Sequence, residues 1–222
     1  MSVAGVSSPI NGTVTFSGTT ITFTPTTGYT GAASFTYTVK NTANLISTPA
    51  TVSVTVNAAG SNAASLFAAA NTPATITVSD HSAVELGVKF QSSVAGKITG
   101  IRFYKSPQNL GTHTAHLWTS TGTSLGAATF TGETASGWQQ ANFATPVTVQ
   151  ANTVYVASYF APQGLYSADA NYFANARVSG VLTALASAGT GGNGVYAYSA
   201  VSKFPTSTFN DTNYWVDVVF MS

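Results

Sequence analysis

The sequence contains no cysteine. This absence excludes disulfide bonds, thiolate metal sites and cysteine nucleophiles together. Charged side chains are also scarce, because they make up 6% of the residues, whereas about a quarter is usual in soluble domains. Thr, Ser, Asn, Ala and Gly take their place, and Thr, Val, Tyr and Phe suit half-buried strands. This composition is typical of secreted bacterial β-domains and atypical of cytosolic enzymes.

The sequence also lacks a large excess of one charge sign and lacks long apolar runs. The 7 basic and 6 acidic side chains leave a formal net charge of +1 and are scattered along the chain. The sequence therefore has no basic stripe that would bind the phosphates of a nucleic acid. No apolar run approaches the length of a membrane span, and nothing before Gly12 resembles a signal peptide. We therefore expect a secreted or cell-surface protein whose export signal lies upstream of this fragment.

The first segment alternates between apolar and polar residues. Period-two strands are predicted at residues 13–16, 20–23, 34–39 and 50–56. The next residues lose this period and are typical of a flexible linker. We accordingly predict three parts of the chain, with these limits: a first domain at 1–57, a linker at 58–65 and a second domain at 66–222.

The first segment resembles the Ig-like, cadherin-like repeats of large bacterial adhesins. The resemblance is carried by residues 11–16, 23–25, 28–31 and 35–39. It implies a partial Ig-like sandwich that looks truncated, because such repeats usually open with additional strands, and it should present an unpaired edge. No Asp or Glu precedes Asp80, so the first segment offers no carboxylate to Ca²⁺.

The second segment is longer and more aromatic. Strands are predicted at residues 84–90, 97–104, 114–118, 126–130, 137–143, 147–149, 153–160, 195–198 and 214–220. Short polar turns between them predict an all-β domain, a larger jelly-roll-like antiparallel β-sandwich. The regular succession of strands and turns is interrupted between Ala161 and Gly194, where residues 181–186 are expected to form a short helix. A loop of that length is usually functional or disordered.

The second segment resembles an uncharacterised bacterial family, a domain of unknown function (the 4082 family) found in multi-domain surface proteins. The matching residues are 85–90, 100–105, 111–114, 117–118, 137–139, 158–162, 193–196 and 213–220. The resemblance implies a fold and an extracellular setting, and it brings no established reaction.

Strand parity suggests one candidate site. Glu85, Arg102, Tyr104, Trp215 and Asp217 would share a sheet face if the strands that carry them are neighbours. An aromatic ring, a guanidinium and carboxylates would suit a sugar. The alternative is a structural ion cluster of Glu85, Arg102 and Asp217 that fixes strand register. We favour the cluster, because paired charges on strands more often order structure than bind ligands.

Loop residues suggest a second candidate site. Its members are aromatic, amide and imidazole side chains outside the predicted core: Asn109, His113, Tyr166, Asn171, Tyr172, Asn193 and Tyr196. Aromatic rings and amides suit a pyranose, which has an apolar face and polar hydroxyls. The alternative, that the aromatic rings pin the loop onto the sandwich, stays open. Trp118 and Trp138 are expected in the core.

Metal and cofactor signals are weak. His113 and His116 are three residues apart in extended chain, so they should point to opposite faces. Asp80, Asp169 and Asp211 are the carboxylates that could contribute to a Ca²⁺ site, although none lies in a dense acidic loop. No nucleophile-elbow motif is present, and we predict no cofactor.

These patterns leave three functions open. The leading hypothesis is a non-catalytic extracellular module that binds glycan or another surface polymer. The first alternative is a structural stalk or assembly domain, and the second is a glycan-acting enzyme or accessory domain built on Glu85 and Asp217. The sequence leaves the oligomeric state open.

Overall fold

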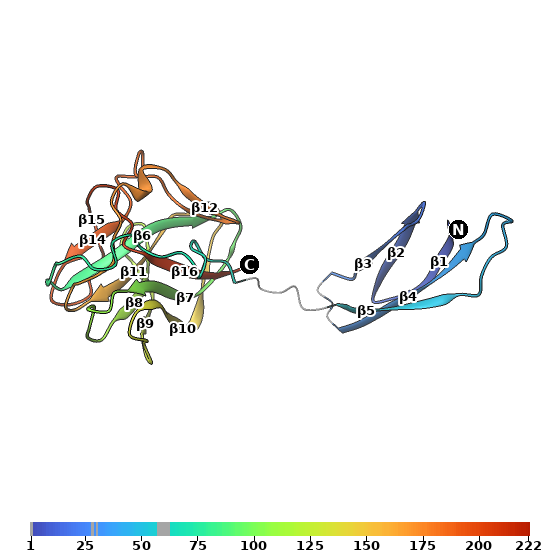
Figure 1. Ribbon diagram of the computed structural model, residues 1–222, viewed down its shortest axis with the longest axis horizontal. Coiled ribbons are helices and arrows are strands. Elements are labelled where there is room, and N and C mark those ends of the chain that lie inside the picture. The colour runs from blue at the N-terminus through green and yellow to red at the C-terminus, as the bar shows by residue number, and fades with distance from the viewer. Residues whose placement is uncertain (1, 28, 30, 57–62) are drawn as a thin grey trace. The chain divides into compact units, whose positions relative to one another are not determined.

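The computed structural model describes residues 2–27, 29, 31–56 and 63–222. The chain divides into two compact units, residues 1–61 and 62–222, and each is considered by itself (Figure 1). Residues 58–62 of the predicted linker lie outside the described residues. Ala64, which we also placed in the linker, exchanges two backbone hydrogen bonds with Phe220 of the second unit, both 2.8 Å long.

The first unit is built from one antiparallel sheet and one hairpin. The sheet has the order β1-β4-β5, and β2 pairs with β3. The bounds are β1 Ser2–Ile10, β2 Gly12–Ser17, β3 Thr20–Pro25, β4 Gly31–Lys40 and β5 Ala50–Val56. The predicted Ig-like strands are therefore present. Among the described residues, β1 and β5 each form a sheet ladder on one side only, and Phe35 stacks against Phe23 of the hairpin at 5.8 Å.

Strand β1 is a continuous opening strand, whereas the sequence of residues 2–7 indicated only a strand followed by a turn. It pairs with β4 in a register that shifts between Val3 and Gly5 and again between Ser7 and Ile10. Ser8 also has a positive φ of 51°. These irregularities interrupt the alternation of the side chains, which explains why no continuous strand was predicted there.

The second unit is an antiparallel β-sandwich, as predicted. Its small sheet has the order β10-β7-β16, and its large sheet has the order β12-β13-β6-β11-β8-β9, with β14 beside β6 and β15 beside β14. The small-sheet strands are β7 Gly96–Lys105, β10 Gly137–Val149 and β16 Val216–Met221. The large-sheet strands are β6 Val84–Ser92, β8 Thr114–Thr119, β9 Ser124–Thr129, β11 Tyr155–Ala161, β12 Arg177–Ser179, β13 Leu182–Ala184, β14 Val195–Tyr198 and β15 Ser207–Thr208.

The core lies between these two sheets. Val84, Leu86, Val88 and Phe90 of β6 are each at most 1% exposed, as the alternation of that strand predicts. The small sheet contributes Ile101 and Phe103 of β7 and Val218 of β16 to the same core. Burial of this apolar surface is the main force that holds the sandwich together.

The predicted helix at residues 181–186 is wrong. Leu182–Ala184 form strand β13, which pairs with Phe90–Ser92 at one end of β6. Leu182 and Ala184 are both fully buried, as the two-residue period of a strand requires. The stretch is too short for its apolar pattern to distinguish a strand from a helix.

A cover segment, residues 64–75, crosses the outer face of the small sheet. The Asp217 carboxylate accepts the backbone N–H groups of Leu66 at 2.7 Å and Phe67 at 3.3 Å. The Arg102 guanidinium donates to Asp217 at 2.5 Å and to the Phe67 carbonyl at 2.8 Å. Phe67 is thereby held over the sheet, where its ring lies 5.1 Å from that of Trp215.

The substitution Asp217→Asn should destabilise the second unit by about 3–5 kcal/mol, because it removes one partner of a buried ion pair. Asp217 is fully buried, so water cannot replace the interaction that Arg102 loses. Chemical denaturation of the full chain measures the change, with Asp211→Asn as the matched control on a partly exposed aspartate. Equal stability of the two variants would contradict the role given to Asp217.

Candidate functional site

The predicted sheet platform is assembled but covered. Arg102, Tyr104 and Trp215 do lie together on the outer face of the small sheet, and Tyr172 packs against Trp215 at 5.8 Å. Trp215 is only 3% exposed, however, because the cover segment lies on it. Its indole Nε1 donates to Asp169 at 3.0 Å. This face packs against its own chain and does not form an open sugar platform.

Glu85 does not join Arg102 and Asp217, so its place in the predicted ion cluster is wrong. Strand β6 belongs to the large sheet, where β11 and β14 are its neighbours opposite Glu85. There the Glu85 carboxylate accepts a hydrogen bond from Ser158 Oγ at 2.6 Å and lies 3.2 Å from His116 Nδ1. Trp118, expected in the core, is only half-buried and donates to Ser158 at 2.8 Å.

Ser202, His116 and Glu85 have the residue types of a hydrolase triad. The Ser202 hydroxyl lies 3.2 Å from His116 Nδ1 and 3.3 Å from Nε2. Nδ1 is also the ring nitrogen nearest Glu85. A triad needs one ring nitrogen for the hydroxyl and the other for the carboxylate, so in this geometry Glu85 does not orient His116 as a general base for Ser202.

Asn109 and His113 are buried, which contradicts their predicted role as ligand contacts. Both are 0% exposed. His113 lies 2.8 Å from Asn109 through Nε2 and 2.8 Å from Glu133 through Nδ1, and Lys105 bridges to Glu133 at 2.7 Å. Burial lowers the pKa of His113, and Glu133 acts in the opposite direction. No local pattern indicated that Glu133, twenty residues on, would reach His113.

Asn193 is likewise a structural residue. It is fully buried, and its side chain accepts the Lys89 N–H at 2.8 Å and donates to the carbonyls of Lys89 and Leu185. These bonds tie the loop before β14 to strand β6. Asn171 is exposed at the start of a 3-10 turn, Tyr172–Ala174, and takes the left-handed conformation there.

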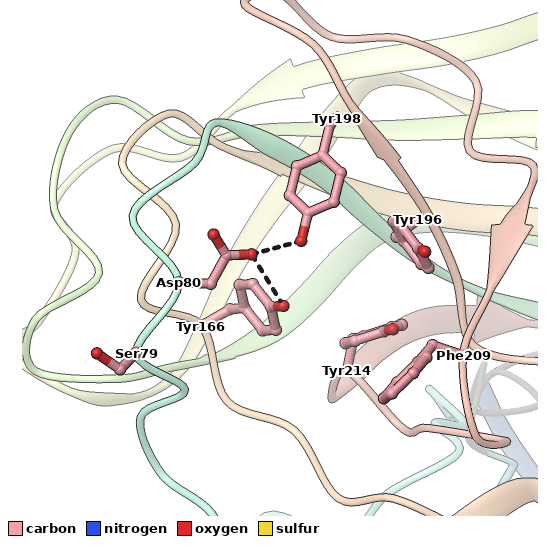
Figure 2. A pocket seen from close by; sticks show the side chains of 7 residues that line it. All are labelled: Ser79, Asp80, Tyr166, Tyr196, Tyr198, Phe209 and Tyr214. Carbon is pink, nitrogen blue, oxygen red and sulfur yellow. Dashed lines mark hydrogen bonds between the residues drawn. The ribbon is translucent and has the colours of Figure 1, made fainter.

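Two of the predicted ligand residues, Tyr166 and Tyr196, do meet in a pocket. This tyrosine pocket has a volume of about 440 Å³. Figure 2 shows its lining, which consists of Ser79, Asp80, Tyr166, Tyr196, Tyr198, Phe209 and Tyr214. Phe209 is 59% exposed and Tyr198 is 54% exposed, whereas Tyr166 and Tyr214 are buried. Aromatic rings therefore form both the rim and the wall.

Two glycines allow the segments of the pocket to approach closely. Gly164 has a φ of +65°, and a Cβ there would lie 2.1 Å from the Asp80 carbonyl. The neighbouring Leu165 N–H donates to that carbonyl at 2.6 Å. A Cβ on Gly194 would lie 1.6 Å from the Thr212 carbonyl. Only glycine fits at either position, and these contacts bring Tyr166 to Asp80 and β14 to Tyr214.

Asp80 is the centre of the hydrogen bonding in the pocket. Its Oδ2 accepts the hydroxyl protons of Tyr198 at 2.6 Å and Tyr166 at 3.2 Å, as the dashed lines in Figure 2 show. Its Oδ1 accepts the Ser82 N–H at 2.9 Å. Partial burial acts to raise the pKa of Asp80, but the hydrogen bonds from Tyr198, Ser82 and Tyr166 outweigh it and leave that pKa below its usual value.

Tyr166, Tyr198 and Tyr214 keep their protons. Burial raises the pKa values of Tyr166 and Tyr214, and the hydrogen bond to Asp80 raises that of Tyr198. Tyr198 was not predicted as a site residue, although it shares the predicted strand 195–198 with Tyr196, and Tyr214 was predicted only as the first residue of the last strand. The available signal was the spacing of Tyr196 and Tyr198, which places both on one face of β14.

Two of the three aspartates considered for Ca²⁺, Asp80 and Asp169, lie in separate environments. Asp80 accepts tyrosine hydroxyls, whereas Asp169 accepts the N–H groups of Ala74 and Thr75 at 3.0 and 2.9 Å. Within the described residues, no three His, Cys, Asp or Glu side chains are placed to hold one metal ion.

No helix in the described part of the chain has the length and apolarity needed to cross a membrane.

Comparison with protein families gave two matches. The model of a domain of unknown function (DUF4082) matches residues 70–216, and the model of a bacterial Ig domain matches residues 1–57. The Ig match indicates a module of an extracellular surface protein. Neither the curated proteins nor the solved structures contain a match to this chain.

The substitution Asp80→Asn should lower the pKa of Tyr198, because the carboxylate hydrogen bond that raises it is lost. A pH titration followed by NMR of ¹³Cζ-labelled tyrosine in the full chain measures this change, with Tyr198→Phe used to assign the resonance. The resonance of Tyr29 in the first unit serves as the internal reference. An unchanged titration of Tyr198 would show that Asp80 does not hold its proton.

Proposed function

Because the chain belongs to the family defined by the domain of unknown function (DUF4082), which matches residues 70–216, and also matches a bacterial Ig domain, we propose that it is a non-catalytic binding module of an extracellular bacterial surface protein. The proposed ligand is a glycan, and the proposed site is the tyrosine pocket.

The observation that carries this proposal is the lining of the pocket. Five aromatic side chains surround a space of about 440 Å³ that also holds one carboxylate. Concave, mainly apolar pockets with a few placed polar groups are the usual form of ligand sites. A pyranose presents an apolar face that packs on aromatic rings and hydroxyls that bond to polar groups. The exposed rings of Phe209 and Tyr198 are placed to make the first of these contacts.

The first unit supports a different role, that of a spacer. It matches a bacterial Ig domain. Its apolar pocket of about 420 Å³ is lined by Val3, Ile21, Val39 and Val52 together with hydroxyl-bearing residues, and it contains no charged side chain among those described. We assign glycan recognition to the second unit, which has the aromatic pocket. We assign to the first unit the role of a spacer between the second unit and the rest of the surface protein.

The substitution Phe209→Ala should weaken glycan binding by about fivefold or more, since an aromatic contact contributes about 1 kcal/mol beyond its buried area. A glycan array with the full chain identifies the ligand, and affinity electrophoresis then measures the loss. Phe16→Ala is the matched control, because Phe16 is 42% exposed in the first unit and should leave binding unchanged. A chain that binds no glycan on the array, or binds equally after Phe209→Ala, would disprove this proposal.

A further inference from the structure

The direction of the hydrogen bonds in the tyrosine pocket specifies a class of ligand. We propose that the pocket selects a protonated amine, and therefore binds unacetylated amino sugars in preference to neutral or acidic sugars. This inference rests on the proposed function, because it concerns the ligand of the same pocket.

The hydroxyls beside Asp80 have no proton left for a ligand. A tyrosine hydroxyl has one proton to donate and oxygen lone pairs to accept with. Tyr198 and Tyr166 both give that proton to Asp80 Oδ2. At this end, the pocket therefore presents acceptors, namely two phenol oxygens polarised by a carboxylate. A ligand group that binds there must supply N–H or O–H donors, which an ammonium group does best.

The charge of the lining points the same way. Among the described residues that line the pocket, Asp80 supplies the charge and none is Lys, Arg or His. The faces of the aromatic rings carry the negative end of a quadrupole, which attracts cations placed over them. Tyr166 meets Tyr214 edge to face at 5.7 Å, and Tyr196 meets Tyr198 at 5.5 Å, so ring faces of different orientations border one space. A carboxylate or sulfate group on a ligand would find no positive partner here.

Asp80 is also ionised under the conditions in which an amine is protonated. The hydrogen bonds that it accepts leave its pKa below the usual value, despite partial burial. At about pH 5.5, between the ordinary pKa of a carboxyl group and that of an amine, both charges are present. The attraction between them is then available to distinguish ammonium from acetamide.

Calorimetry with the full chain at about pH 5.5 tests this selectivity. The probes are glucosamine, N-acetylglucosamine and galacturonic acid oligomers of one length. We expect the glucosamine oligomer to bind about tenfold more tightly than its acetylated counterpart, because its ammonium group would form charge-assisted hydrogen bonds beside Asp80, and the galacturonic acid oligomer to bind weakest. Asp80→Asn, which keeps the shape of the side chain, should reduce this preference to about twofold or less, and Phe16→Ala should leave it unchanged.

The possible results separate this inference from the proposed function. Equal binding of the glucosamine and N-acetylglucosamine oligomers, with both weakened by Phe209→Ala, would overturn the selectivity for amines and leave glycan binding in the pocket intact. A preference for glucosamine that survives Asp80→Asn would overturn the role of Asp80. Absence of binding to every glycan on the array would instead remove the proposed function itself.

Discussion

The buried ion pair between Asp217 and Arg102 fixes the path of residues 64–80, and the rest of the second unit depends on this path. It fastens the backbone of Leu66 and Phe67 to the small sheet. Asp169 then accepts the N–H groups of Ala74 and Thr75 further along, and the Asp80 carbonyl accepts the Leu165 N–H. The Asp217 and Asp169 carboxylates and the Asp80 backbone thus guide residues 64–80 from the sheet face to the tyrosine pocket.

Local pattern was sufficient to predict most of the strands. Residues 50–56 and 195–198 were predicted with the bounds that the structure shows, because their alternation is regular and turn residues flank them. The alternation of β6 also predicted its buried face correctly. Pattern failed where the backbone departs from extended geometry. Trp215 has a φ of +55°, and its N–H bonds to the Asn213 side chain at 2.8 Å, so the last strand begins at Val216 and not at residue 214 as predicted.

The candidate site was only partly predictable for a different reason. Tyr166 and Tyr196 were recognised by residue type, and the pocket unites them. Asp80 lies 86 residues before Tyr166 and 118 before Tyr198 in the chain, and no local rule pairs residues so far apart. The same holds for Glu85, whose neighbours are decided by sheet order: the sequence indicated that β6 exists but not that it joins the large sheet. Long-range pairing sets which polar residues become buried structure and which face a pocket.

The antiparallel contact between Ala64 and Phe220 also has a mechanical consequence. The polypeptide enters the second unit beside the strand on which that unit ends. Tension between these two ends therefore pulls the paired chains apart from one edge, so the hydrogen bonds bear the load one after another. Behind the first pair, Asp217 grips Leu66 and Phe67. Together with the Ser179 hydroxyl, which donates to the Ser65 carbonyl at 2.8 Å, that carboxylate forms the first side-chain barrier to forced unzipping of the domain.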